Sequence, residues 1–374
     1  MFFGYHFQNY RLRLLVYILA LSGIGLLAVR SAAEQDSSLF MKQAVGVGLS
    51  LAVCLAVSLV DYHRLVRYAV PIYGICIGLL GLVLILGINH KGAVRWLKLG
   101  PVQIQPSEFV KIGMVLFFAW FLERCQDTIN RPVTILKMMV LCGIPLAMVF
   151  KQPNLSTTIV ITVMLLCMIY SAGISYRWIG GALIVGIPTV SAVLYLALQD
   201  KLPFLHQYQV QRILARFFDS GGQYADINRQ QNNSIMAIGS GQLRGKGLFN
   251  NTLASVKNGN FLSEESTDFI FAIIGEEMGF VGCMLVIALY AAAVFECLWI
   301  GAHAEDRTGK LICTGMASLL AFQSFANIAV ATGIFPNTGL PLPFISSGIS
   351  SMLSMFIGMG IVLNIGLQRT SESN

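Results

Sequence analysis

The chain has 374 residues, of which 56% are hydrophobic and 11% are charged, and its formal net charge is +7 at pH 7. A soluble globular domain carries about a quarter charged residues, so this composition excludes an ordinary soluble enzyme. In a membrane protein, positive charge is read by the side of the membrane on which it lies, and we expect no nucleic-acid partner.

About ten apolar segments, each close to the length that crosses a bilayer, follow one another along the chain. They lie at residues 14–30, 44–60, 68–88, 106–122, 134–150, 156–172, 178–198, 268–299, 310–333 and 350–367. The eighth exceeds one bilayer thickness, so its first part is expected to form a shorter helix in or near the interface. The sequence therefore predicts an all-α integral membrane protein with a single polytopic domain over residues 1–374 and a long loop, 199–267.

Lysine and arginine are more frequent in the loops that a cytoplasmic N-terminus places inside than in the short loops that it places outside. This asymmetry predicts that both termini are cytoplasmic. Arg11 and Arg13 precede the first apolar segment, as in a signal peptide. Because further spans follow at once, we expect a retained first helix.

Both extended outer segments carry positive charge on the side where the insertion rule disfavours it. Loop 89–107 contains Arg95, Trp96 and Lys98, and loop 199–267 contains Arg212 and Lys246. An anionic ligand is the simplest explanation for this charge. Arg212 is the best candidate for bidentate contact with a phosphate, since a guanidinium presents two parallel donors.

The fourth span opens with an ionisable pair, Glu108 and Lys111, in the sequence Gln105-Pro106-Ser107-Glu108-Phe109-Val110-Lys111. A spacing of three puts both side chains on one helix face, close enough to pair. Pro106 suits the first helical turn, and Gln105 or Ser107 is expected to cap it. Two interpretations stay open: a structural ion pair, or a pair that positions a phosphate or a catalytic group.

The eighth span is entered through Glu264-Glu265-Ser266-Thr267-Asp268, and Asp268 is the last acidic residue before the apolar phase. Partial burial would raise the pKa of Asp268 towards neutrality, as a general base requires. Alternatively, Asp268 is the N-cap of the helix, which is the commoner role of aspartate there. Glu276 and Glu277 follow, and we expect them to pair with a basic group or to lie at a helix break.

Two segments are rich in glycine or proline. Gly239–Gly247 contains Arg244 and Lys246 and fits either an anion-binding loop or a flexible one. Residues 335–344, followed by Ser346, contain too much proline and glycine for a regular helix. The second segment is therefore expected to be a re-entrant or lining loop.

Taken together, these segments closely resemble the SEDS family, the RodA/FtsW/SpoVE group of bacterial cell-wall polymerases. The motifs that carry the resemblance are Arg95-Trp96, Gln105-Pro106-Ser107-Glu108 with Lys111, Gln152-Pro153, Tyr208-Gln209 with Arg212, Gly239 to Gly247, Thr267-Asp268-Phe269-Ile270-Phe271-Ala272 with Glu276-Glu277, and Pro341-Leu342-Pro343-Phe344-Ile345-Ser346. The chain departs from the usual family pattern at Asn154, Ser266, Ser347 and Ile349. The short N-terminal segment favours a RodA-like member.

The resemblance implies ten spans, a large outer loop and peptidoglycan glycosyltransferase activity on lipid II. Asp268 matches the essential aspartate of the family, which overrides the capping interpretation, and Glu108 and Lys111 match its paired charges. The resemblance also implies a class B penicillin-binding protein as partner. We expect Asp268 to deprotonate the acceptor hydroxyl while undecaprenyl pyrophosphate leaves from the donor.

The remaining candidates are expected to contact the lipid-linked sugar or pyrophosphate. They are Arg95, Lys98, Glu108, Lys111, Arg212, Lys246 and Ser346. A divalent cation, Mg²⁺ or Mn²⁺, could share the neutralisation of the pyrophosphate, and the sequence does not decide this point. The alternatives are a flippase for lipid II, which would require polar groups along a whole transmembrane path, and a scaffold that recruits another enzyme.

Overall fold

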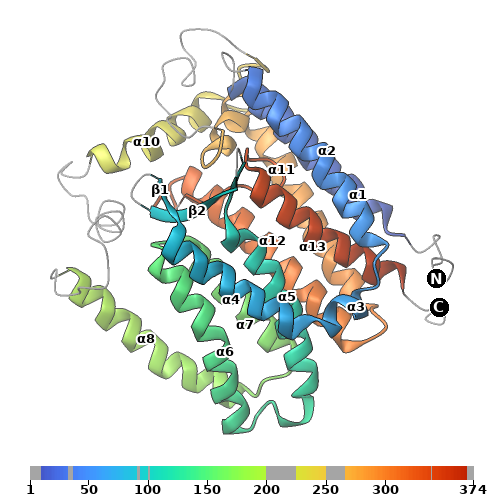
Figure 1. Ribbon diagram of the computed structural model, residues 1–374. Helices are drawn as coiled ribbons and strands as arrows, with labels where there is room; N and C mark the ends of the chain where they lie inside the picture. The colour runs from blue at the N-terminus through green and yellow to red at the C-terminus, as the bar shows by residue number, and fades with distance from the viewer. Residues whose placement is uncertain are drawn as a thin grey trace.

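The computed structural model describes residues 10–32, 37–90, 93–99, 102–198, 225–249, 266–337 and 339–368. It is a helical bundle with one small β-sheet (Figure 1). Each predicted span coincides with a long helix. These helices are α1 Leu12–Ala32, α2 Ser37–Ser58, α4 Ala69–Leu86, α5 Pro106–Arg124, α6 Pro132–Lys151, α7 Leu155–Ser171, α8 Tyr176–Leu198, α11 Ile270–Ala302, α12 Arg307–Ala331 and α13 Ile349–Leu367.

The described residues also include three shorter helical segments, α3 Tyr62–Arg67, the 3₁₀ turn η2 Gln126–Thr128 and α10 Ala225–Ser240. Within the described residues, 7 helices are long and apolar enough to cross a membrane by length and composition. The predicted all-α membrane fold is thereby confirmed, while the exact number of spans stays a prediction. Apolar side chains such as Ile85 and Ile184 face outwards, as expected where lipid replaces water around a bundle.

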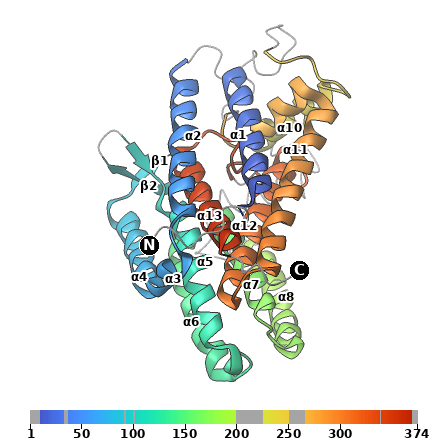
Figure 2. The ribbon, with the colours of Figure 1, turned by 90° about the vertical axis from the view of Figure 1, so that its right-hand side faces the viewer.

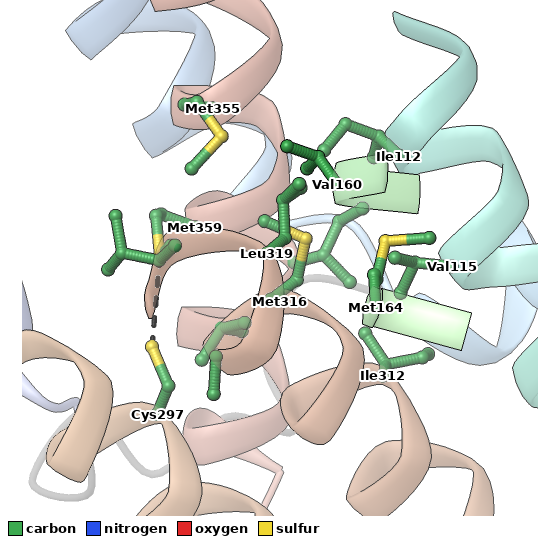
Figure 3. Close-up of a cluster of buried hydrophobic side chains, with 14 of the residues drawn as sticks. Ile112, Val115, Val160, Met164, Cys297, Ile312, Met316, Leu319, Met355 and Met359 are labelled. Atoms are coloured by element: carbon green, nitrogen blue, oxygen red, sulfur yellow. Dashed lines mark hydrogen bonds between the residues drawn. The ribbon is translucent and has the colours of Figure 1, made fainter. Parts of the chain in front are cut away.

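Helices α12 and α13 form the centre of the bundle. In the most apolar 18-residue stretch of each helix, 67% of the residues are buried in α12 and 78% in α13, against 22% in α2. Figure 3 shows the core between them and their neighbours: Ile112 and Val115 of α5 and Val160 and Met164 of α7 meet Met316 of α12. On the other side of this core, Cys297 Sγ of α11 lies 3.8 Å from Met359 Sδ of α13. Because of this close packing, α12 and α13 give rigid support to the segments that contact them.

Part of segment 89–107, which we treated as a loop from its sequence, belongs to an antiparallel sheet. Strands β1 Ile88–His90 and β3 Val102–Ile104 both pair with β2 Ala93–Leu99. Within β2, Leu97 is buried and Lys98 is exposed, which is the alternation that a half-buried strand produces. The sequence signal was weak because the outer strands are only three residues long.

Helix α11 is broken near its beginning. Gly279 has φ 64° and ψ −163°, a conformation that is essentially restricted to glycine, and separates a short first helix from the long second one. This confirms the prediction that the eighth apolar segment begins as a shorter helix. Helix α10 packs against the first part of α11 at one end of the bundle (Figure 2).

At the opposite end of the bundle, a buried amide joins α13 to the turn between α2 and α3. Asn364 of α13 donates from Nδ2 to the carbonyl of Ser58 (2.8 Å) and accepts from the backbone N–H of Tyr62 (2.9 Å). Arg11, just before α1, lies against Gly366 near the end of α13. The first and last described helices therefore begin and end on the same side, as an even number of crossings requires.

Candidate active site

Asp268 lies immediately outside the first part of α11 and is half-buried. The N-cap position of this helix belongs to Phe269, so the capping interpretation of Asp268 was wrong by one residue. The side chain of Phe269 cannot accept a hydrogen bond, and the helix begins without a side-chain cap at that position. Asp268 thus stands at the junction between an irregular segment and a buried helix.

The proline- and glycine-rich segment packs directly against the residues that precede α11. The hydroxyl of Ser346 donates to the carbonyl of Thr267 and accepts from the N–H of Leu342. Ser347 donates to the carbonyl of Ser266 from its N–H (2.8 Å) and from its hydroxyl (2.9 Å). The segment is irregular, as predicted. Ser346, which we expected to contact substrate, joins this segment to the residues that precede α11.

Gly339 of the same segment lies beside the carboxylate of Asp268. A Cβ added at Gly339 would stand 3.2 Å from Asp268 Oδ2. Glycine at this position therefore avoids a close contact between a side chain and the carboxylate.

The predicted ion pair of α5 is present and buried. Lys111 Nζ lies 2.9 Å from Glu108 Oε2, with side-chain exposures of 0% and 2%. Lys111 also donates to Gln323 Oε1 of α12 (2.8 Å), and Gln323 Nε2 donates to the carbonyl of Pro341 (3.1 Å). A continuous chain of polar contacts thus runs from Glu108 to the segment that packs against Asp268.

The start of α5 is partly as predicted. Pro106 opens the helix, and Gln105 occupies the N-cap position but makes no side-chain cap hydrogen bond. Gln105 instead donates from Nε2 to the hydroxyl of Ser107 (3.2 Å). The expected capping by Gln105 or Ser107 was therefore wrong, because the two side chains bind each other.

Sequence reasoning missed the two amide residues of α12. Gln323 and Asn327 are four residues apart and both are buried. Asn327 Nδ2 donates to the carbonyls of Asp268 (2.9 Å) and Leu340 (2.6 Å). The available signal was two amide side chains at helical spacing inside an apolar span, where polar groups need partners.

The basic candidates outside α5 that the structure describes differ in their surroundings. Half-buried Arg95 donates to the carbonyls of Gln152 and Pro153, so its guanidinium holds the α6–α7 turn. Lys98 is exposed on β2. Lys246 Nζ lies 2.6 Å from Glu276 Oε1, which confirms that Glu276 pairs with a basic group. Arg212 lies outside the described residues.

The glycine-rich segment that contains Lys246 fills the break in α11. The N–H groups of Lys246 and Gly247 donate to the carbonyls of Glu276 (2.9 Å) and Glu277 (3.1 Å), and Phe280 N–H donates to the carbonyl of Gln242 (2.8 Å). These bonds satisfy backbone groups that the broken helix leaves without intrahelical partners. Those two N–H groups thus hold the segment to the broken helix, and anion binding by its charged side chains stays a prediction.

We expect Gly245→Ala to destabilise this junction more than Gly247→Ala. Both glycines have positive φ, 79° and 96°, so alanine introduces backbone strain of about 1–3 kcal/mol in either variant. A Cβ at Gly245 would stand 2.0 Å from the carbonyl oxygen of Glu277, whereas nothing lies within 4 Å at Gly247. Thermal unfolding of the two purified variants measures the difference, and equal losses would contradict the close contact.

No group of three or more His, Cys, Asp or Glu side chains among the described residues could hold a metal ion. Of the two carboxylates considered for a divalent cation, Glu108 is paired with Lys111 inside the bundle. The cation therefore stays a prediction. Any such ion would rest mainly on oxygen atoms of a phosphate-bearing substrate, as is common for Mg²⁺.

Comparisons with known proteins cover nearly the whole chain. The family model of the FtsW, RodA and SpoVE cell cycle proteins matches residues 11–371. The peptidoglycan glycosyltransferase MrdB of Escherichia coli K12 is 34% identical over 358 residues, which is 95% of this chain and 93% of that protein. The probable peptidoglycan glycosyltransferase FtsW of Trichlorobacter lovleyi is 33% identical over 372 residues, 96% of this chain and 94% of the relative.

Solved structures are similar over the same extent. A chain from a peptidoglycan synthase complex, described as coordinating polymerization and crosslinking, matches with a TM-score of 0.78 and 26% identity, covering 99% of this chain and 100% of that one. The rod shape determining protein RodA of Thermus thermophilus matches with a TM-score of 0.70 and 26% identity, covering 99% of both chains.

Proposed function

The chain belongs to the FtsW, RodA and SpoVE family, and from this premise we propose that it is a peptidoglycan glycosyltransferase that polymerises lipid II into glycan strands. The observation that carries the proposal is the 34% identity to a peptidoglycan glycosyltransferase over 95% of the chain. The geometry agrees with it, since a half-buried aspartate lies between an irregular loop and a broken helix at one end of a membrane bundle.

We propose that this end of the bundle is the outer one and that both termini are cytoplasmic. The excess of Lys and Arg in the opposite loops favours this orientation. Arg11 and Gly366, near the beginning of α1 and the end of α13, lie together on that opposite side. Asp268, α10 and the β-sheet would then face the compartment in which glycan strands are assembled.

In the proposed reaction, the carboxylate of Asp268 takes the proton of the acceptor sugar's 4-hydroxyl. The hydroxyl oxygen attacks the anomeric carbon of the donor, the new glycosidic bond forms with inversion, and the bond to undecaprenyl pyrophosphate breaks. The pyrophosphate carries away the electron pair of that bond, and fixed positive charge can stabilise it in place of a general acid. Lys98 and Arg212 are proposed for that contact, together with Arg95 and Lys246 where their present partners leave donors available.

Glu108, Lys111 and Ser346 are proposed to act by holding the site rather than by touching substrate. The ammonium of Lys111 is fully enclosed, and its contacts run through Gln323 to the carbonyl of Pro341. A buried pair of this kind fixes geometry provided that both charges keep their partners.

We further propose that the chain works with a class B penicillin-binding protein, which crosslinks the strands. The likeness to a synthase complex that coordinates polymerization and crosslinking supports this partner.

The function is tested by incubating the purified chain with lipid II, with and without its penicillin-binding partner. We expect glycan ladders on a gel, more abundant with the partner present. If intact lipid II gives no ladder even with the partner, the proposal fails. Transport of labelled lipid II across proteoliposomes would then identify a flippase.

A further inference from the structure

Asn327 joins two segments that meet at the proposed catalytic carboxylate. Asn327 is 1% exposed and lies near the end of α12, and both hydrogens of its amide are used. One bond reaches the carbonyl of Asp268 and the other reaches the carbonyl of Leu340, next to Gly339. One amide therefore joins the main chain of Asp268 to the segment that contains Leu340 and Gly339.

The bond to Asp268 completes a series in which four consecutive carbonyls have donors. The carbonyl of Ser266 accepts from Ser347, that of Thr267 from Ser346, and that of Phe269 from the N–H of Ala272. The remaining carbonyl, that of Asp268, accepts from Asn327. Because the peptide planes on both sides of Asp268 are held in this way, the direction of its Cα–Cβ bond is fixed.

We propose that Asn327 is a positioning residue for the transferase reaction, which holds the main chain of Asp268 so that its carboxylate meets the acceptor hydroxyl. This inference depends on the proposed function. A base must stay within hydrogen-bond reach of the proton it takes, so a small displacement of residue 268 is expected to slow the chemical step more than substrate binding. Gln323, one turn away, holds Pro341 in the same manner and extends the support along the loop.

Asn364 provides a matched control at the other end of the bundle. It is also buried, at 0% exposure, and its amide also joins two distant chain segments by donating to a backbone carbonyl, here that of Ser58. Replacing Asn364 should remove a comparable amount of stability without moving Asp268.

The test compares Asn327→Ser and Asn327→Leu with Asn364→Ser and Asn364→Leu. The serine variants retain one donor, and the leucine variants retain none with the same number and branching of side-chain heavy atoms. For each purified protein we would measure thermal unfolding in detergent and the kcat and KM of lipid II polymerisation. Asn327→Leu is expected to lower kcat about tenfold to a hundredfold with KM within about twofold, because misplacement of a catalytic group by about 1 Å has such effects.

Asn327→Ser should give an intermediate kcat, and both Asn364 variants should keep kcat within about twofold of wild type at a similar loss of Tm. Wild-type kcat in Asn327→Ser, or a fall of kcat in Asn364→Leu equal to that in Asn327→Leu, would overturn the inference. If Asn327→Leu does not fold, the comparison of kcat between Asn327→Ser and Asn364→Ser decides the test. A wild-type protein without polymerising activity would instead overturn the proposed function itself.

Discussion

Asp268→Asn is expected to abolish polymerisation of lipid II while the protein remains folded in the membrane. The amide has the shape of the carboxylate but cannot take the proton of the acceptor hydroxyl. Loss of a general base costs about 10²–10⁴-fold in rate, which removes visible glycan ladders in an end-point assay. The variant should be extracted, purified and thermally unfolded like the wild type, since Asp268 is only half-buried.

Asp127→Asn is the matched control for charge, because Asp127 is an exposed carboxylate in the η2 turn. This variant should polymerise like the wild type. In the wild type, kcat/KM should fall as the pH drops through the pKa of the base. Any residual activity of Asp268→Asn should not show this decline. Full glycan yield from Asp268→Asn would mean that another group takes the proton.

The features that the sequence predicted correctly depend on local chemistry. Apolar stretches of bilayer length predicted the positions of the long helices, since backbone groups in a bilayer must be paired within a helix. The pairing of Glu108 with Lys111 followed from a spacing of three on one helix. The break in α11 was signalled by a segment too long for one span and by two adjacent glutamates before Gly279.

The features that were missed depend on contacts between distant segments. Nothing local indicates that Asn327 reaches the carbonyl of Asp268, 59 residues away in the chain. The packing of the glycine-rich segment was not foreseen for the same reason, since its glycines lie against carbonyls of a broken helix about 30 residues away. Arg95 was assigned to an anion from the positive charge of its loop and from the resemblance, and its hydrogen bonds to two backbone carbonyls, 57 and 58 residues away in the chain, were not foreseen.

Lys111→Met is expected to destabilise the protein by about 3–5 kcal/mol, because it leaves Glu108 buried without its counter-charge. The double variant Glu108→Leu, Lys111→Met should recover most of this loss, since two apolar side chains replace two buried charges. Thermal unfolding in detergent measures both effects. Lys137→Met is the control, because Lys137 is exposed on α6 and its replacement should change stability by less than about 0.5 kcal/mol.

The activity of the double variant separates the two interpretations of this pair that the sequence left open. Without Lys111, Gln323 loses the donor that orients its amide towards the carbonyl of Pro341, in the loop that packs against the Asp268 segment. We therefore expect stability to return while the kcat of polymerisation stays at least about tenfold low, as in a displaced site. Recovery of both stability and kcat would show that the pair serves packing alone. Recovery of neither would show that Gln323 cannot keep the loop in place in an apolar surrounding.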